Sequence, residues 1–297
     1  MQKMSLKFLP LILFVAFAAW IITSKKPSTV LNPINKEGKI TVTASFYPLY
    51  FFTKEITGER VKVINLTKAG SEPHDFEPST KDIRTIENSK LLIVNGNTFE
   101  SWLPQFGEQI SQENTQILKV GENPDPHLWL DPVLAQNQVE MINSKLREID
   151  PTNATFYQTN SRTLIQKLIE LDGEFKAGLS KCEKNKIITS HGAFAYLAQR
   201  YNLRQVSIQG LNPDGDPSPA KIAEAAKLAK ENGINYIFFE TLVSPKIAET
   251  IAKEIGAKTL VLNPIEGLNE AEEQSGQNYL SIQRENLANL RLALNCQ

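Results

Sequence analysis

Short apolar segments alternate with helical patterns in two separate runs along this 297-residue chain, and one long helical pattern lies between the runs. Alternation of strand and helix predicts βαβ units, whose strands form a mostly parallel sheet. The expected fold class is therefore α/β, with two lobes joined by one long rigid helix. We expect strands over residues 39–45, 61–66 and 90–95 in the first run, and over 186–190, 204–208, 234–239 and 258–262 in the second.

Boundary residues place the helices of both runs. In the second run, two helices begin with Ser-Pro, at residues 218–219 and 244–245, and they end at Gly233 and Gly256. Serine before a helix and glycine after it are strong boundary signals. The other helices are expected over residues 47–57, 79–88, 194–201 and 276–294.

Two consecutive helices are predicted in the centre of the chain. Asp131 is a candidate N-cap, and Pro132 a first helical residue, for a helix that ends at Ile149. The next pattern, over residues 153–179, places its apolar residues three, four or seven positions apart, on one helix face. Such a helix spans about 40 Å, which suits a strut between two lobes. We therefore expect an N-terminal lobe over residues 39–150, a linker helix over 151–180 and a C-terminal lobe over 181–297.

The N-terminus has the features of an export signal. Lys3 and Lys7 precede an uncharged apolar run over residues 8–22. This run is shorter than the roughly 20 apolar residues that span a membrane, so it fits a secretory signal. Ala16-Phe17-Ala18 is a candidate cleavage site, and the alternative is an uncleaved anchor. We expect a signal peptide or anchor over residues 1–23, a polar tether over 24–38, and a periplasmic location; no cysteine follows the apolar run to carry a lipid.

Charge and cysteine content exclude several classes of protein. The 32 Lys+Arg residues nearly balance the 33 Asp+Glu residues, which argues against a nucleic-acid-binding protein with a basic surface. Hydrophobic residues make up 41%, enough for a folded core. Cys182 and Cys296 are too few for a disulfide framework or a thiolate zinc cage. They form either one disulfide or two free thiols, and both alternatives stay open.

Only three histidines occur in the chain, and each lies in a loop next to a predicted helix or strand end. His74 follows a strand, His127 precedes the helix that starts at Pro132, and His191 lies in a strand-to-helix turn. In open α/β sheets, ligands bind where such loops gather, at the carboxyl ends of strands. Three imidazoles with one oxygen ligand form a natural site for Zn²⁺. The alternative is that each histidine is a structural loop residue.

Four motifs resemble those of the TroA-like substrate-binding proteins, the metal-binding subunits of zinc and manganese ABC importers, and in particular the zinc-uptake, ZnuA-type members. The resemblance covers about residues 38–297. The motifs are PHDFEPS, DPHLWLDP, SHGAF and GLNPDGDPSP, the last followed by a helix and then FFE, in the family's order and spacing. The resemblance implies two α/β lobes bridged by a long helix. It also implies that His74, His127 and His191 bind the metal between the lobes.

The fourth ligand is less well defined, because many family members have an aspartate where this chain has Asn263. Asn263 is a poor zinc ligand. Glu266 lies three residues further on, and some zinc-importing members are similar in using a glutamate there, so we predict Glu266. The alternatives are water or a carboxylate near the first histidine, Glu72 or Glu77. Glu240, at a strand end, is expected to line the cleft.

The resemblance implies a non-catalytic function in transport. It implies a monomeric periplasmic receptor that captures Zn(II) and delivers it to the membrane permease of an ABC importer. The chain has no Gly-Lys-Ser/Thr phosphate-binding loop, so the ATPase is expected to be a separate polypeptide. Imidazole favours zinc over manganese, which prefers oxygen ligands.

Three other functions remain as alternatives. The first is the same transport role for Mn(II). The second is a zinc-dependent hydrolase, since a three-histidine site with an open position can activate water, although His-Glu-x-x-His is absent. The third is a cell-surface adhesin, since the family includes cell-adhesion proteins, or a metal store.

Overall fold

The computed structural model describes residues 38–96, 98–112, 115–213 and 217–297. These residues belong to one compact unit. The predicted signal segment 1–23, and the predicted tether apart from Gly38, lie outside the described residues. Among the helices that are described, none has both the length and the apolar character needed to cross a membrane.

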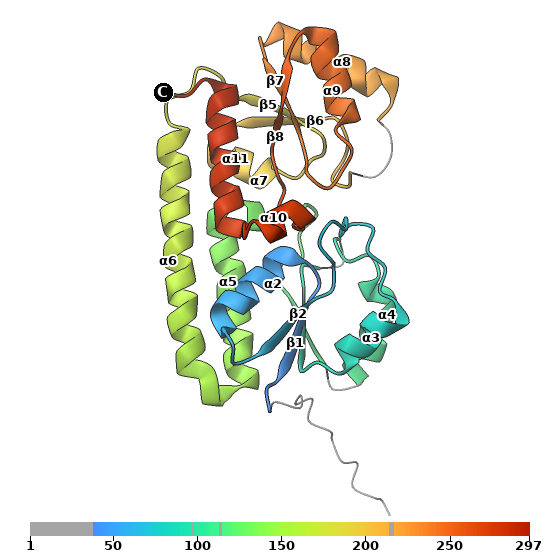
Figure 1. Cartoon of the computed structure of the whole chain (residues 1–297), viewed down its shortest axis with the longest axis vertical. Helices are drawn as coiled ribbons and strands as arrows, with labels where there is room; N and C mark the ends of the chain where they lie inside the picture. Colours follow the sequence, from blue (N-terminus) through green and yellow to red (C-terminus); the bar gives the residue numbers. More distant parts are fainter. Residues whose placement is uncertain (1–37, 97, 113–114, 214–216) are drawn as a thin grey trace, which may run out of the picture. The chain divides into compact units, whose positions relative to one another are not determined.

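The first lobe is a four-stranded parallel sheet in the order β2-β1-β3-β4. Figure 1 shows helices α2, α3 and α4 around this sheet. β1 and β3, the two central strands, are buried along their whole length. Parallel strands are covered on both faces, which explains why β3, LLIV, is apolar throughout. β1, TVTA, also contains two buried threonines. The elements of this lobe are β1 (Thr41–Ala44), α2 (Tyr47–Thr57), β2 (Lys62–Asn65), α3 (Thr80–Glu87), β3 (Leu91–Val94), α4 (Leu103–Gln112) and β4 (Gln116–Lys119).

The second lobe repeats this topology, with a parallel sheet in the order β6-β5-β7-β8. Two parallel sheets with helices confirm the predicted α/β class. In both lobes the first strand lies next to the second and the third, so the chain reverses direction across the sheet there. The elements are β5 (Lys186–Thr189), α7 (Ala195–Arg200), β6 (Arg204–Ser207), α8 (Pro219–Glu231), β7 (Tyr236–Phe239), α9 (Lys246–Ile255), β8 (Lys258–Val261), α10 (Glu270–Gln274) and α11 (Tyr279–Leu294).

Local capping explains where several helices begin. Ser79 and Asp82 form a reciprocal capping box at the start of α3. The Ser218 side chain accepts from the backbone N–H of Lys221 at the start of α8. At α9, by contrast, the N-cap residue is Pro245, one position later than the predicted Ser244.

Two long helices connect the lobes. A short 3₁₀ turn, η1 (Leu128–Leu130), leads into α5 (Pro132–Ile149), and a second turn, η2 (Pro151–Asn153), leads into α6 (Ala154–Gly178). Asp131 caps α5 by accepting from the N–H groups of Val133 and Leu134. α6 packs along α5 and contacts α2 of the first lobe and α11 of the second (Figure 1). The long helix is therefore a packed element against both lobes rather than a free-standing strut.

The C-terminal region differs from the sequence prediction. The last helix starts at Tyr279 rather than at Gly276, because Asn278 caps it and Gly276 adopts a positive φ of 73°. The short helix α10 was not predicted, and neither were α4 and β4. Cys182 and Cys296 form a disulfide, which resolves the two alternatives.

Candidate metal centre

His74 lies in the loop between β2 and α3. Its backbone N–H donates to Glu72 Oε1 at 3.2 Å, which shapes the turn that presents the imidazole. The ring meets Phe99 edge to face, with 4.6 Å between centroids. The side chain is only 5% exposed, so the imidazole points into the protein.

His127 immediately precedes η1 and is completely buried. Asp125 Oδ1 accepts from the His127 backbone N–H at 3.0 Å and lies 2.8 Å from Nδ1. The carboxylate thereby directs Nε2 toward the interior, as is usual for metal-binding histidines. The amide of Asn95, at the end of β3, donates to Pro126 O at 2.8 Å and fixes this loop to the first sheet.

His191 lies in the turn after β5 and is also completely buried. Glu240, at the end of β7, accepts from the His191 backbone N–H at 3.2 Å. Its other oxygen lies 2.7 Å from Nδ1, an ion-pair contact that is not aligned as a hydrogen bond. The carbonyl of His191 accepts from Thr189 Oγ1 at 2.7 Å and from Gln205 Nε2 at 2.9 Å, so the turn is held from both sides.

Glu266 lies in the loop after β8, in a turn with an unusual backbone. Ile265 has a φ of 58°, a left-handed conformation that is costly for a β-branched residue. Asn263 stabilises this turn, because its Oδ1 accepts from the Ile265 N–H at 2.7 Å. Asn286 of α11 bonds to both the N–H and the carbonyl of Asn263. Asn263 is therefore a loop-shaping residue, and the turn directs the Glu266 carboxylate inward.

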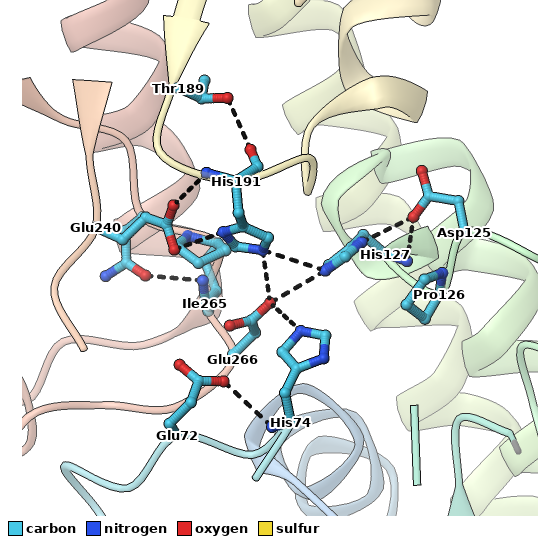
Figure 2. A network of polar contacts seen from close by, with 12 residues as sticks. Glu72, His74, Asp125, Pro126, His127, Thr189, His191, Glu240, Ile265 and Glu266 are labelled. Atoms are coloured by element: carbon cyan, nitrogen blue, oxygen red, sulfur yellow. Dashed lines mark hydrogen bonds and ion pairs between the residues drawn. The ribbon is translucent and has the colours of Figure 1, made fainter. Parts of the chain in front are cut away.

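The four side chains meet at one point, as Figure 2 shows. Glu266 Oε1 lies 3.2 Å from the Nε2 atoms of His74 and His127 and 3.5 Å from that of His191. The Nε2 atoms of His127 and His191 are 3.4 Å apart. One ligand atom from each of the four residues lies within 4.8 Å of all the others. A tetrahedron with bonds of 2.0–2.1 Å has edges of about 3.3–3.4 Å. Four of the six separations among the ligand atoms, at 3.2–3.5 Å, lie close to this value.

Glu266 and two of the imidazoles shift one another's pKa values. Burial alone would raise the pKa of Glu266, but hydrogen bonds from the three imidazoles outweigh it and hold that pKa well below its ordinary range. Burial lowers the pKa of His127, but Asp125 and Glu266 raise it above its ordinary value. Burial also lowers the pKa of His191, but Glu240 and, after it, Glu266 raise this pKa to about 10. A metal ion binds neutral imidazole, so it competes with the protons that these contacts favour on His127 and His191.

The other candidate carboxylates lie outside the four-ligand cluster. Glu77 is exposed in the loop before α3. Glu240 contacts His191 through Nδ1, on the side of the ring away from the cluster. Glu72 is beside the site, and one of its oxygens is buried without a hydrogen-bond partner. Burial first, and then Glu266, raises the pKa of Glu72 to about 8.

Comparison with known proteins identifies the family of the chain. Residues 42–293 match the family model described as "ZnuA: Zinc-uptake complex component A periplasmic". The chain belongs to this family. Among curated ZnuA relatives, the high-affinity zinc uptake system protein ZnuA of Bacillus subtilis is 37% identical over 308 residues, which cover 95% of this chain and 97% of that protein.

Longer relatives contain a ZnuA-like part. The zinc-binding protein AdcA of Streptococcus pyogenes serotype M1 is 37% identical over 313 residues, and the match spans 94% of this chain but 60% of AdcA. The chain thus spans about 60% of the length of the AdcA proteins that it matches. The Zn(II)-bound ZnuA-like domain of Streptococcus pneumoniae AdcA has a similar fold, with a TM-score of 0.79 and 38% identity over 87% of this chain and all of that one.

Several residues of this ZnuA-family site were not identified from the sequence. Asp125 is part of the DPH motif, and an acidic residue two positions before a candidate ligand is a signal that could have identified it. Asn286 and Trp129, whose indole donates to Pro264 O at 2.7 Å, support the Glu266 loop. They lie far from Glu266 in sequence, and no local pattern indicates their role.

Proposed function

We propose that this chain captures Zn²⁺ outside the cytoplasmic membrane, through His74, His127, His191 and Glu266, and delivers it to an ABC importer. The observation that carries this proposal is the spacing of the four ligand atoms. Four of the six separations among the three imidazole nitrogens and the carboxylate oxygen, at 3.2–3.5 Å, lie close to the edges of a zinc tetrahedron.

The composition of the ligand set favours zinc over manganese. Manganese prefers oxygen-rich octahedral shells, whereas imidazole suits zinc. Three of the four ligand atoms in this cluster are nitrogens, and the fourth belongs to a single carboxylate. The zinc-bound AdcA domain with the similar fold supports the same choice.

A carrier role fits the geometry better than catalysis does. A catalytic zinc site has three protein ligands and a fourth position for water. In the proposed site four protein groups would bind the ion, so it would have no position left for a water nucleophile. The metal ion is cargo in this proposal and takes part in no reaction.

The family, rather than the site, supports the proposed delivery to a membrane permease. The family model is that of a component of a zinc-uptake complex, and the ZnuA relative is named for a high-affinity zinc uptake system. We propose that the permease and the ATPase of this importer are separate polypeptides. The chain contains no phosphate-binding Gly-Lys-Ser/Thr loop that could hydrolyse ATP.

The test measures metal binding by untagged protein. Elemental analysis and competition titration should find one zinc per chain, with manganese bound much more weakly. His74→Ala, His127→Ala and His191→Ala should each weaken zinc binding strongly and leave the metal-free protein folded. Glu174→Gln, in the exposed ion pair with Arg284 between α6 and α11, is the matched control and should bind zinc like wild type. Wild-type zinc affinity in any histidine variant would overturn the ligand assignment.

Transport needs a separate measurement. Cells that lack the gene should grow poorly only when zinc is limiting, and the wild-type gene should restore growth. The histidine variants should fail to restore it. Growth of the deletion strain on limiting zinc at the wild-type rate would contradict the uptake role.

A further inference from the structure

The short helix α7 forms hydrogen bonds to the His127 loop both before and after the histidine. Tyr196 Oη, in its first turn, donates to the carbonyl of Asp125 at 3.2 Å. Arg200 Nε, at its last residue, donates to both carboxylate oxygens of Asp131, at 2.9 and 2.7 Å. Asp125 and Asp131 flank His127 in sequence, so one helix fixes the loop before and after the imidazole.

The same helix begins next to His191. The turn from His191 to α7 is tightly packed, because the Gly192 N–H donates to Gly210 O at 2.7 Å. A Cβ added to Gly192 would approach that oxygen to 3.1 Å, so the turn has little room to move. α7 is therefore a rigid connection of a few residues between His191 and the groups that hold His127.

The ion pair between Arg200 and Asp131 connects the end of α7 to the start of α5. Asp131 is only 2% exposed, and its Oδ1 also accepts from Val133 N–H at 2.8 Å to cap α5. The Arg200 side chain is 31% exposed. Charge-assisted hydrogen bonds to a buried carboxylate are stronger and shorter than neutral ones. The contact thus fixes α7 to the first residue before α5.

We propose that Arg200 and Tyr196 are positioning residues that set the spacing of His127 and His191 and thereby the preference for a small tetrahedral ion. This inference rests on the proposed zinc site. The two Nε2 atoms are 3.4 Å apart, a tetrahedral edge for Zn²⁺. Selectivity between cations depends on the size and rigidity of the site. If the distance between His127 and His191 were less restricted, zinc would bind more weakly, and the affinity for a larger ion would fall less.

The experiment compares four variants of the full chain. Arg200→Gln removes the ion pair, Arg200→Lys keeps the charge without the planar guanidinium, and Tyr196→Phe removes only one hydroxyl. Arg284→Gln is the matched control, because Arg284 forms an exposed pair with Glu174, with Nε 2.9 Å from Oε2, between α11 and α6. Zinc and manganese affinities are measured by competition titration, and Co²⁺-substituted protein is examined by visible absorption.

Arg200→Gln should weaken zinc binding roughly 10-fold or more, as is typical when a group that orients a metal ligand is lost. Manganese binding should change less, so the zinc-to-manganese affinity ratio should fall and the tetrahedral Co²⁺ bands should weaken or shift. Tyr196→Phe should move both readouts in the same direction by a smaller amount. Arg200→Lys should recover part of the loss, and Arg284→Gln should match wild type.

The outcomes separate this inference from the proposed function. If wild-type protein bound no zinc, the zinc site itself would be wrong. A second outcome is that wild type binds zinc and that the Arg200→Gln and Tyr196→Phe variants fold and keep the zinc-to-manganese affinity ratio and the Co²⁺ spectrum of wild type. This outcome would overturn only the positioning role. If Arg200→Gln failed to fold, Tyr196→Phe and Arg200→Lys would decide, because each changes the contact conservatively.

Discussion

At the scale of single residues, one buried carboxylate joins the ends of the two central strands of the first sheet. Glu100 Oε1 accepts from Ser45 Oγ at 2.6 Å and from Asn95 N–H at 3.0 Å, and Oε2 accepts from Gly96 N–H at 2.7 Å. Burial raises the pKa of Glu100 to about 6, although these hydrogen bonds act in the opposite direction. Asn95 in turn holds Pro126, so the network reaches the His127 loop.

Glu100 should make the metal-free protein less stable as the pH rises. Its folded pKa of about 6 exceeds its ordinary value of 4.5, so between these pH values the folded state binds more protons than the unfolded chain. The stabilising contribution is present below about pH 4.5 and is lost as the pH rises through 6. The difference of about 1.5 pKa units corresponds to about 2 kcal/mol.

Urea unfolding of wild type and Glu100→Gln across pH 4–7 measures this effect. The wild-type free energy of unfolding, minus that of the variant, should fall by about 2 kcal/mol over this range. A difference that is constant or rises with pH would show that the Glu100 carboxyl does not titrate as its burial indicates.

At the scale of elements, the disulfide joins segments that follow two packed helices. Cys182 follows α6 and Cys296 follows α11, and the bond closes a sequence separation of 114 residues. Two backbone hydrogen bonds align the same segments: Lys184 N–H donates to Leu294 O, and Gln297 N–H donates to Lys181 O. This junction lies at the end of α6 and α11 next to the second sheet, away from the loops between the lobes (Figure 1).

Replacement of both cysteines by serine should lower stability and leave zinc binding unchanged. Loss of a loop closure of this length costs about 4–5 kcal/mol in the chain-entropy model, as an upper figure. Thermal unfolding and zinc titration of the double variant measure the two effects, and thiol titration of denatured wild type should find no free thiol. Two free thiols in wild type, or a weakened zinc affinity in the variant, would contradict this account.

At the scale of the whole compact unit, one hydrophobic cluster extends through both lobes. It includes Val42 in β1, Leu168 and Phe175 in α6, Phe194 before α7, and Leu290 in α11. The backbone of segment 125–131 is also hydrogen-bonded to the second half of the chain, because the Gln283 side chain donates to Leu130 O at 3.1 Å. A shared core of this kind resists a large hinge opening, because separation of the lobes would expose buried apolar surface.

Zinc should therefore stabilise the protein without a large change in its dimensions. Binding to the folded state alone raises stability by RT ln(1 + [L]/Kd), about 4 kcal/mol when free zinc is 1,000 times Kd. Calorimetry should show a higher melting temperature with zinc, while small-angle scattering should give the same radius of gyration with and without it. A clear compaction on zinc binding would indicate a hinge that this shared core should prevent.

The sequence by itself determined the order and type of most elements, because their signals are local. Alternating apolar segments, the caps Ser79, Asp131 and Ser218, and the terminating glycines act within one or two turns of the backbone. β4 was missed because it is a four-residue strand, QILK, with polar ends and no clear alternation. The three histidines could be singled out because the chain has no others and all lie in loops.

Tertiary structure alone decided which groups meet. His74 and Glu266 are 192 positions apart, and only the order of strands in two sheets and the shared core bring their side chains to 3.2 Å. The same packing leaves Glu77 exposed and joins Cys182 to Cys296. It also bonds the His127 loop to α7, although sequence alone assigns that loop to the first lobe. Local periodicity carries no information about distances between loops, because those distances depend on how the sheets and helices pack.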